Sequence, residues 1–336
     1  MSITQEKIAR KLGVSQSSVS IVLNRKGNLL SPKTHDRILR TAEVMGYSKK
    51  RFSSLPGMKT GNVAFLVRGI DTYYARFLQG ITHEAQRNGC TVTIYTMQQD
   101  SAMVADIIFH QRKLDGLILQ ELLSPDTVER LKRHLPVVLL NRRLPQVSID
   151  SVMPDNAGGI EKAVRHLFSL GHRRIAFFGT TPLDLHGEER MRGYYDGLRS
   201  CELESAPSFV QLIPARTGSV EETEKIAGRV LATWRKLPER PTAAVAIGDV
   251  WALPLIKAAH RLGVSVPAEM SIVGFSNIYA CVHSHPSLSS IEQPMEDMGK
   301  KAFSLLVERI QSPDRPIQQI ILDTELICRE SIGPAS

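Results

Sequence analysis

The sequence contains few cysteines and no long apolar run. Its 336 residues hold four scattered cysteines without a C-x-x-C pair, at Cys90, Cys201, Cys281 and Cys328. That spacing argues against a zinc ribbon and against a disulfide framework. The longest apolar runs, such as Pro136–Leu140 and Ala243–Ile247, are far shorter than a membrane span. Because the first residues also lack a basic start followed by an apolar stretch, we expect no secretory signal and predict a cytoplasmic protein without a membrane partner.

Sequence signatures of enzyme active sites are also missing. Gly158-Gly159 belongs to neither a G-x-G-x-x-G motif nor a Walker loop, so no phosphate-binding loop is expected. The ten histidines include no H-E-x-x-H, and His283-x-His285 has no acidic or cysteine partner nearby. No G-x-S-x-G nucleophile elbow occurs either. We therefore expect a protein that is not an enzyme and needs neither a metal nor a cofactor.

The composition is typical of a folded soluble protein. Hydrophobic residues make up 42% of the chain and charged residues 23%, as in globular proteins rather than disordered or fibrous ones. A chain of 336 residues is too long for one ordinary core. It is long enough for a small module followed by two lobes.

Positive charge is concentrated at the N-terminal end. The formal net charge is +8, and residues 1–60 hold twelve lysines and arginines against three acids. The remaining residues hold thirty basic and thirty-one acidic side chains. A compact basic module ahead of a nearly neutral body predicts a head that binds a polyanion. The alternative is a solvated basic face with no partner.

Three short amphipathic helices are expected at the N-terminal end. Thr4 is a good N-cap for the first helix, and Gly13 can end it in a tight turn. Ser15 can cap the second helix, and Ser31 followed by Pro32 can open the third. The second helix follows the first after a Gly-Val-Ser turn, which is helix-turn-helix geometry. In such a module the second helix enters the major groove of DNA.

The outward face of the second helix and the helix ends predict the DNA contacts. Glutamine can bond bidentately to adenine, serine is less selective, and isoleucine can contact a thymine methyl group. Polar side chains near helix ends can reach phosphates, which position the module without reading sequence. The expected base contacts are Gln16, Ser17, Ser20 and Ile21, and the expected contacts from helix ends are Thr4, Ser15, Asn24, Ser31, Thr34 and His35. A three-helix protein-interaction module is the alternative, and the basic charge favours DNA.

Nearly the whole chain resembles a known family. The stretches IARKLGVSQSSVSIVLN and LLSPKTHDRILRTAEVMGY are similar to the DNA-binding head of the lactose-repressor/galactose-repressor (LacI/GalR) family of bacterial regulators. The run LGHRRIAFFG and the ending ELICRES are specific in combination. The resemblance implies that Gln16 and Ser17 read bases. A third reading position, commonly arginine in the family, is Ile21 here, which removes one guanine or phosphate contact.

The resemblance implies a cytoplasmic, nucleoid-associated transcription regulator, by default a repressor, that is controlled by a small-molecule effector. The effector would be a sugar, a sugar phosphate or another polar metabolite. Because one helix reads few base pairs, we expect a homodimer on a roughly palindromic, double-stranded operator. An exported solute-binding protein is disfavoured by the missing signal and the basic head, and a head fused to a metabolic enzyme by the missing phosphate loop. No heptad tail follows Ser331, so no zipper for tetramers is expected.

A linker at residues 48–60 follows the head. Pro56-Gly57 stops any helix, and one or two helical turns are too short to be stable in water. The resemblance implies a hinge helix that folds only on operator DNA and wedges Leu55 into the minor groove, which kinks the duplex. Lys50 is expected to contact the DNA backbone. The family's usual Asn and Ala-Arg are replaced by Lys49 and Phe52-Ser53, so a plain flexible linker is the alternative.

From Gly61 onward, short apolar runs alternate with amphipathic helical stretches. This alternation predicts parallel, doubly wound sheets, and the number of strands predicts two lobes. The expected strands are Asn62–Val67, Val92–Thr96, Gly116–Leu119, Val137–Leu140, Ile175–Phe178, Phe209–Leu212, Ala243–Ile247 and Ser271–Gly274. The fold class is therefore an all-α helix-turn-helix head plus an α/β body of two doubly wound parallel-sheet lobes, similar to a periplasmic binding protein.

The domain bounds follow from these elements and from the resemblance. We expect a DNA-binding head at 1–47, a hinge at 48–60 and an effector-binding and dimerisation domain at 61–336. In the family three crossings join the lobes, placed here near Asp155, near Ser287–Glu292 and near Pro313–Ile317. The expected N-lobe is about 61–154 and 288–313, and the expected C-lobe is about 155–287 and 314–333.

Ligands of such folds lie outside the carboxyl ends of the strands, which places an effector in the cleft between the lobes. The candidates are side chains that follow strand ends: Tyr73, Tyr74, Asn141, Arg142, Arg190, Arg216, Asp249, Ser276 and Asn277. Aromatic faces with Arg, Asp and Asn bind polyhydroxylated or planar polar ligands. The alternatives are lobe packing for the tyrosines, surface ion pairs for Arg142 and Arg190, and a cleft that has lost its effector response.

The resemblance adds detail to this site. In the family, the position matching Arg190 contacts the effector, and so does an Asn-Asp pair whose Asn is Gly248 here. The family's Gly-Phe-Asp-Asp segment reads Gly-Phe-Ser-Asn at 274–277, and the loss of that carboxylate disfavours a simple neutral sugar. Arg216, together with Arg142 and Arg190, would favour an anionic effector.

Overall fold

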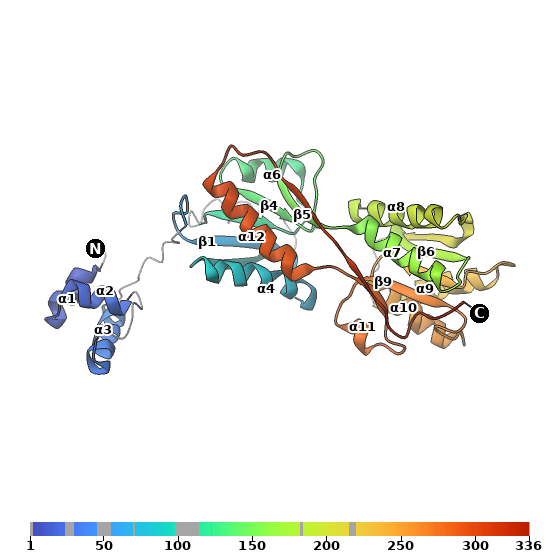
Figure 1. The fold of residues 1–336 in the computed structure, drawn as a ribbon, viewed down its shortest axis with the longest axis horizontal. Coiled ribbons are helices and arrows are strands. Elements are labelled where there is room, and N and C mark those ends of the chain that lie inside the picture. Colours follow the sequence, from blue (N-terminus) through green and yellow to red (C-terminus); the bar gives the residue numbers. More distant parts are fainter. Residues whose placement is uncertain are drawn as a thin grey trace.

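The computed structural model describes residues 3–23, 30–45, 55–69, 71–97, 114–121, 123–181, 184–214 and 220–335. Three helices form a head at one end of the molecule, and two α/β lobes follow it in a row (Figure 1). The fold class expected from the sequence is confirmed. No helix within these ranges is long and apolar enough to cross a membrane.

Local sequence signals set the ends of the head helices, α1 (Gln5–Leu12), α2 (Gln16–Leu23) and α3 (Pro32–Val44). The Thr4 hydroxyl accepts a hydrogen bond from Lys7 N at 3.3 Å, so Thr4 is the N-cap of α1. Gly13 ends α1 with a φ of 67°, a left-handed conformation that glycine adopts without a Cβ clash. Ser31 caps α3 by accepting from Thr34 N at 3.2 Å.

A small apolar core holds the three helices together. Ile8 of α1, Val19 of α2 and Ile38 of α3 are fully buried, and smaller apolar side chains surround them. Because α2 buries Val19 and Val22, its opposite face lies toward solvent. The packing of the head therefore determines which side chains of α2 a partner can reach.

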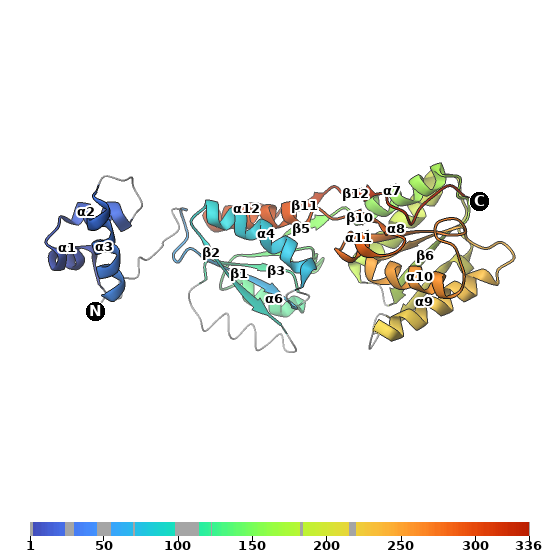
Figure 2. The same ribbon diagram turned by 90° about the horizontal axis from the view of Figure 1, so that it is seen from below.

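The N-lobe is built on a six-stranded sheet in the order β11-β5-β4-β3-β1-β2, with every neighbouring pair parallel. Helices α4 and α12 cover one face of this sheet and α6 covers the other (Figure 2). The strands are β1 (Asn62–Val67), β2 (Thr91–Thr96), β3 (Gly116–Leu119), β4 (Val137–Leu140), β5 (Asp150–Pro154) and β11 (Gln319–Leu322). The helices are α4 (Thr72–Arg87), α6 (Pro125–Lys132) and α12 (Met295–Gln311).

The C-lobe is built on a second six-stranded sheet in the order β12-β10-β9-β8-β6-β7. Strand β12 runs antiparallel to β10, and the other pairs are parallel. Helix α7 packs on α8, and α9 packs on α10. The strands are β6 (Ile175–Thr181), β7 (Val210–Pro214), β8 (Ala243–Ala246), β9 (Ser271–Ser276), β10 (Ser289–Glu292) and β12 (Glu325–Ile327). The helices are α7 (Asn156–Ser169), α8 (Leu185–Ser200), η1 (Pro207–Phe209), α9 (Val220–Arg235), α10 (Asp249–Arg261) and α11 (Ala280–His283).

The chain passes between the lobes three times. The crossings lie at Asp155, between β5 and α7; at Gln293-Pro294, between β10 and α12; and at Asp323-Thr324, between β11 and β12. The lobe bounds expected from the sequence therefore need correction at two places. Residues 289–292 pair with β9 in the C-lobe, and residues 319–322 pair with β5 in the N-lobe. The reason is that these short strands join sheets through hydrogen bonds to strands far away in the sequence.

Candidate functional site

The outward face of α2 carries the residues expected to read bases. Gln16 and Ser17 are exposed, and Ser20 and Ile21 are half-buried. The Ser15 hydroxyl accepts from the backbone N–H three residues on at 3.0 Å and from Ser17 Oγ at 3.3 Å. These bonds stabilise the first turn of α2, so Gln16 and Ser17 are presented from an ordered helix end.

The residues expected to contact phosphates lie at helix ends. Thr4 and Ser31 are the N-caps of α1 and α3. Thr34 and His35 are half-buried in the first turn of α3, and the Thr34 hydroxyl lies 2.9 Å from Ser31 Oγ. Two expected contacts, Asn24 and Lys50, lie outside the described residues. Helix N-termini with hydroxyl caps can contact the phosphates on either side of a DNA groove. The exposed Gln-Ser pair lies beside them.

The end of the linker is attached to the N-lobe. Leu55, expected at the minor groove, packs against the N-lobe core beside the buried Met58. The Asp115 carboxylate, at the start of β3, accepts from the backbone N–H groups of residues 59, 60 and 61 at 2.8, 2.9 and 2.6 Å. It also accepts from Thr60 Oγ1 at 3.0 Å. Sequence reasoning missed Asp115, because nothing local relates it to a segment more than fifty residues earlier.

A cavity of about 460 Å³ lies between the lobes, within the size range of small-molecule sites. It is lined by residues that follow the carboxyl ends of β1, β4, β6, β8 and β9. Seven of the nine residues expected at the cleft line it: Tyr73, Tyr74, Asn141, Arg142, Arg190, Asp249 and Ser276. Residues that the sequence did not indicate also line it: Asp71, Asp184, His186, Trp251 and Phe275. The aspartates among them are N-caps of helices that follow strands, a signal that could have identified them.

Two of the expected cleft residues do not contribute to this cavity. Asn277 does not line the cavity, because its side chain is engaged elsewhere. Its Nδ2 donates to Glu292 Oε2 at 2.7 Å, and its Oδ1 accepts from Arg329 Nη2 at 2.7 Å. Those partners lie on β10 and beyond β12, far from Asn277 in the sequence. Arg216 lies outside the described residues.

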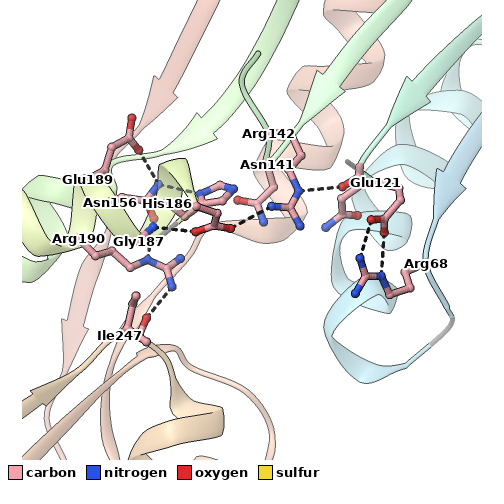
Figure 3. Close-up of polar contacts among 12 residues, drawn as sticks. Arg68, Glu121, Asn141, Arg142, Asn156, His186, Gly187, Glu189, Arg190 and Ile247 are labelled. Atoms are coloured by element: carbon pink, nitrogen blue, oxygen red, sulfur yellow. Dashed lines mark hydrogen bonds and ion pairs between the residues drawn. The ribbon is translucent and has the colours of Figure 1, made fainter. Parts of the chain in front are cut away.

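Arg190 is held in the cavity wall by three groups of the C-lobe. Its Nε donates to Asn156 Oδ1 at 2.9 Å, and its Nη1 donates to the Ile247 carbonyl at 2.7 Å (Figure 3). The guanidinium also lies 3.7 Å from the centre of the Phe275 ring, a cation–π geometry. Burial lowers the pKa of Arg190 to about 10, so it stays charged near neutral pH.

Arg142 reaches the cavity from the N-lobe. Its Nε donates to the Gln120 carbonyl at 3.2 Å, and its Nη1 lies 3.4 Å from Asp184 Oδ2 (Figure 3). Asp184 belongs to the C-lobe, where its other oxygen accepts from Gly187 N at 2.9 Å and caps α8. Arg142 therefore bridges the two lobes at the rim of the cavity.

His186 is uncharged in this setting. Burial, with Arg190 and Arg142 nearby, lowers its pKa to about 3. Its Nδ1 lies 3.1 Å from Asn156 Nδ2. Because an amide nitrogen only donates, Nδ1 accepts, and the imidazole proton lies on Nε2. The backbone of Asn141 accepts a hydrogen bond from His186, so the imidazole contacts both lobes and brings no positive charge to the cavity.

Tyr73 and Asp249 are largely engaged by the protein. The Tyr73 hydroxyl accepts from Asn141 Nδ2 at 2.7 Å, and burial raises its pKa. Asp249 is buried, and its two oxygens accept from Ser290 Oγ at 2.6 Å and from Ile278 N at 2.9 Å. Burial raises the pKa of Asp249. Asp249 was expected to bind effector directly, and in this structure its bonds hold the loops that form the wall.

Two further ion pairs join the lobes beside the cavity. Arg143 pairs with Glu189 at 2.9 Å, and Arg76 pairs with Glu292. Asn156, the first residue after the Asp155 crossing, donates to Glu189 Oε2 at 2.9 Å. No group of acidic, histidine or cysteine side chains in the described ranges could hold a metal ion.

The fold and the cavity together define a two-lobed, periplasmic-binding-protein-like sensor domain that carries a helix-turn-helix head. A family model described as a periplasmic binding protein-like domain matches residues 164–332, half of the chain. The HTH-type transcriptional regulator DegA of Bacillus subtilis is 27% identical over 99% of both chains. The HTH-type transcriptional repressor CytR of Escherichia coli is 28% identical over 98% of this chain and 96% of its own. A solved complex of the transcriptional regulator CelR with cellobiose is 25% identical, with a TM-score of 0.72 over 98% of this chain and 99% of that one.

The chain belongs to the LacI/GalR family of helix-turn-helix transcription regulators. The resemblance read from the head, the LGHRRIAFFG run and the C-terminal ELICRES is thereby confirmed. The match with both relatives extends over the head and the body alike.

Proposed function

We propose that this protein is a homodimeric repressor of the cytoplasm that binds a roughly palindromic operator and responds to a small polar effector. In this proposal the head reads DNA, the cavity between the lobes binds the effector, and the protein is a regulator without enzymatic activity. The observation that carries the proposal is the exposed Gln16–Ser17 pair at the start of α2, inside the most basic segment of the chain.

The head has the charge and the geometry that groove reading needs. Twelve basic side chains against three acids in residues 1–60 attract the phosphate backbone. The buried Val19 and Val22 orient α2 so that Gln16 and Ser17 face outward. Glutamine in this position can bond bidentately to an adenine edge in the major groove.

Exposed apolar side chains support a dimer. Tyr279 and Val282, beside and within α11, are 70% and 56% exposed. Large apolar side chains that gather at helix starts on a surface are unfavourable in water and favour burial against a partner. A second copy of this chain would cover them, and two heads would then meet a two-fold symmetric site.

The effector would act through the arrangement of the lobes. A ligand in the cavity touches both lobes, so it binds most tightly at one relative position of the two. The linker is attached to the N-lobe through Asp115. A change in lobe position would therefore change the spacing of two hinge ends in a dimer, and hence operator affinity.

The test is selection of bound fragments from a random pool of duplex DNA with the full-length protein. We expect a palindromic consensus. Gln16→Ala should relax discrimination at one position of each half-site by about 1–3 kcal/mol. Lys50→Ala, the matched control, should weaken binding to all sequences alike. Selection of no consensus, or an unchanged consensus with Gln16→Ala, would contradict the proposal.

A further inference from the structure

The cavity between the lobes carries two arginines that each leave one terminal nitrogen, Nη2, without a partner in the described part of the chain. Arg190 donates through Nε and Nη1, and Arg142 is engaged through the same two atoms. The Nη2 of each has no partner among the described residues, and both residues line the cavity. We propose that the effector is an anion whose phosphate or carboxylate group binds Arg142 and Arg190, a proposal that rests on the regulatory function above.

The arginines are already positioned for such a ligand. The two guanidinium groups are held in place before any ligand arrives. Their partners are backbone carbonyls, Asn156, Asp184 and the Phe275 ring. A planar guanidinium that is fixed in advance loses little side-chain entropy when it binds an oxyanion. One arginine comes from each lobe, so an anion between them would also draw the lobes together.

The carboxylates of the cavity are mostly engaged elsewhere. Both oxygens of Asp249 and both oxygens of Asp184 accept bonds from the protein. Asp71 uses one oxygen to accept from Tyr73 N and Tyr74 N at 2.9 and 3.0 Å, which caps α4. A neutral polyol needs acceptors for its hydroxyl protons. An oxyanion needs donors, which the two arginines supply; acceptors also remain at the second oxygen of Asp71 and at Asn141 Oδ1.

Helix N-termini add positive partial charge to the cavity, whose described lining holds two arginines and three aspartates. Helices α4, α8 and α10 begin at the cavity, so their N-terminal dipoles point toward it. Burial is the largest cause of the depressed pKa of His186, and the charges of Arg190 and Arg142 lower it further. The pKa of Arg190 is lowered because burial outweighs the carboxylates around it. An anionic ligand would give the Nη2 of that guanidinium a charged acceptor.

The alternative is that the arginines only hold the protein together, Arg142 through Asp184 and Arg190 through Asn156. The chain offers a direct probe of the difference. It has two tryptophans; Trp251 lines the cavity at 8% exposure, and Trp234 is fully buried in the C-lobe core. Collisional quenching of fluorescence in the full-length protein therefore reports on Trp251, and a Trp234→Phe background removes the second signal.

The experiment compares quenching by iodide, an anion, with quenching by neutral acrylamide at constant ionic strength. We expect iodide quenching to fall about threefold or more in Arg142→Gln and in Arg190→Gln, with acrylamide quenching unchanged. Arg87→Gln, an exposed arginine at the C-terminal end of α4 that pairs with Glu84, is the control and should leave both unchanged. Pyrophosphate, as a probe anion, should protect Trp251 from iodide in the wild type. Equal iodide quenching in wild type and both variants, or no protection by pyrophosphate, overturns the proposal.

A thermal-shift panel then separates the ligand classes. The pairs are ribose with ribose 5-phosphate, and glucose with glucose 6-phosphate and with gluconate, each measured against inorganic phosphate at the same ionic strength. We expect a phosphorylated or carboxylated member to raise Tm more than its neutral partner, with the difference lost in Arg142→Gln. A neutral member that stabilises as well or better overturns the anion proposal and leaves the regulatory function standing. Failure to select any operator overturns the regulatory function whatever the cavity binds.

Discussion

At the residue scale, His186 shows how the cavity sets the charge of its own side chains. It is buried, accepts a bond from Asn156, and has a pKa lowered to about 3. A histidine in the unfolded chain titrates near a pH of about 6.5. Between these two values the unfolded state holds a proton that the folded state lacks. Stability contributed by the neutral histidine is therefore complete above the upper value and is lost as the pH falls below it.

We expect His186→Gln to flatten the pH dependence of unfolding. In the wild type this group should contribute a slope of up to about 1.4 kcal/mol per pH unit in the acid range below its unfolded pKa. Glutamine retains an acceptor for Asn156 and does not titrate. Urea unfolding followed by Trp234, in the C-lobe core, measures the slope at several pH values. His260→Gln, an exposed histidine of α10, controls for the substitution; equal slopes in wild type and His186→Gln would contradict the assignment.

Sequence reasoning located candidate residues better than it located their partners. Tyr73, Asn141, Arg142 and Arg190 line the cavity, as positions after strand ends should in a doubly wound fold. The direction of the Asn277 side chain could not be predicted. It bonds Glu292 and Arg329, fifteen and fifty-two positions further along the chain, and so points away from the cavity.

At the element scale, the crossing of α4 and α12 depends on glycine. A Cβ at Gly80 would lie 1.9 Å from the Glu296 carbonyl oxygen, and one at Gly299 would lie 2.2 Å from the Phe77 carbonyl oxygen. Both obstacles are backbone atoms, so the helices would have to separate to make room. These two glycines therefore allow the close contact that covers one face of the N-lobe sheet.

We expect Gly80→Ala to destabilise the N-lobe by about 1–3 kcal/mol, because the added methyl group forces α4 away from α12. Gly228→Ala, in α9, is the matched control, since a Cβ there meets nothing within 4 Å. That change should be neutral or stabilising by up to about 1 kcal/mol, the difference in helix propensity. Thermal unfolding of both variants measures the effect. Equal stability of the two variants would contradict the packing argument.

The linker end is a second element with a testable attachment. We expect Asp115→Asn to destabilise the N-lobe by about 1–3 kcal/mol, because an amide nitrogen cannot accept from the backbone N–H groups that the carboxylate bonds. Operator affinity should fall too, since the hinge would no longer be held to β3. Asp126→Asn removes the same charge from the exposed start of α6 and is the control. Denaturant unfolding and operator titration together test the attachment; unchanged values in both would contradict it.

The elements that sequence reasoning missed are those with the least local signal. The head helices carry their own caps at Thr4, Gly13 and Ser31, and the structure places the helix ends at those residues. Strands β5, β10, β11 and β12, which border the lobe crossings, were not expected. Their sheet membership depends on pairing with distant strands, which no local pattern records.

At the scale of the whole molecule, the cavity and the linker share the N-lobe. Arg142 and Tyr73 line the cavity at the carboxyl ends of the N-lobe strands. Asp115 attaches the linker at the opposite ends of these strands. Within the described ranges, three ion pairs and three crossings join this lobe to the C-lobe. A ligand that favours one lobe arrangement can therefore alter the position of the head without contacting it.

The most direct test of this account is the affinity of the full-length protein for its selected duplex as a function of salt, beside the affinity for a half-site of the same length. The account predicts a log–log slope of about −0.9 for each phosphate neutralised, hence a steep loss of binding with added salt. It also predicts binding to the full palindrome at least about tenfold tighter than to the half-site. A flat salt dependence, or equal affinity for the palindrome, the half-site and an unrelated duplex, would contradict it.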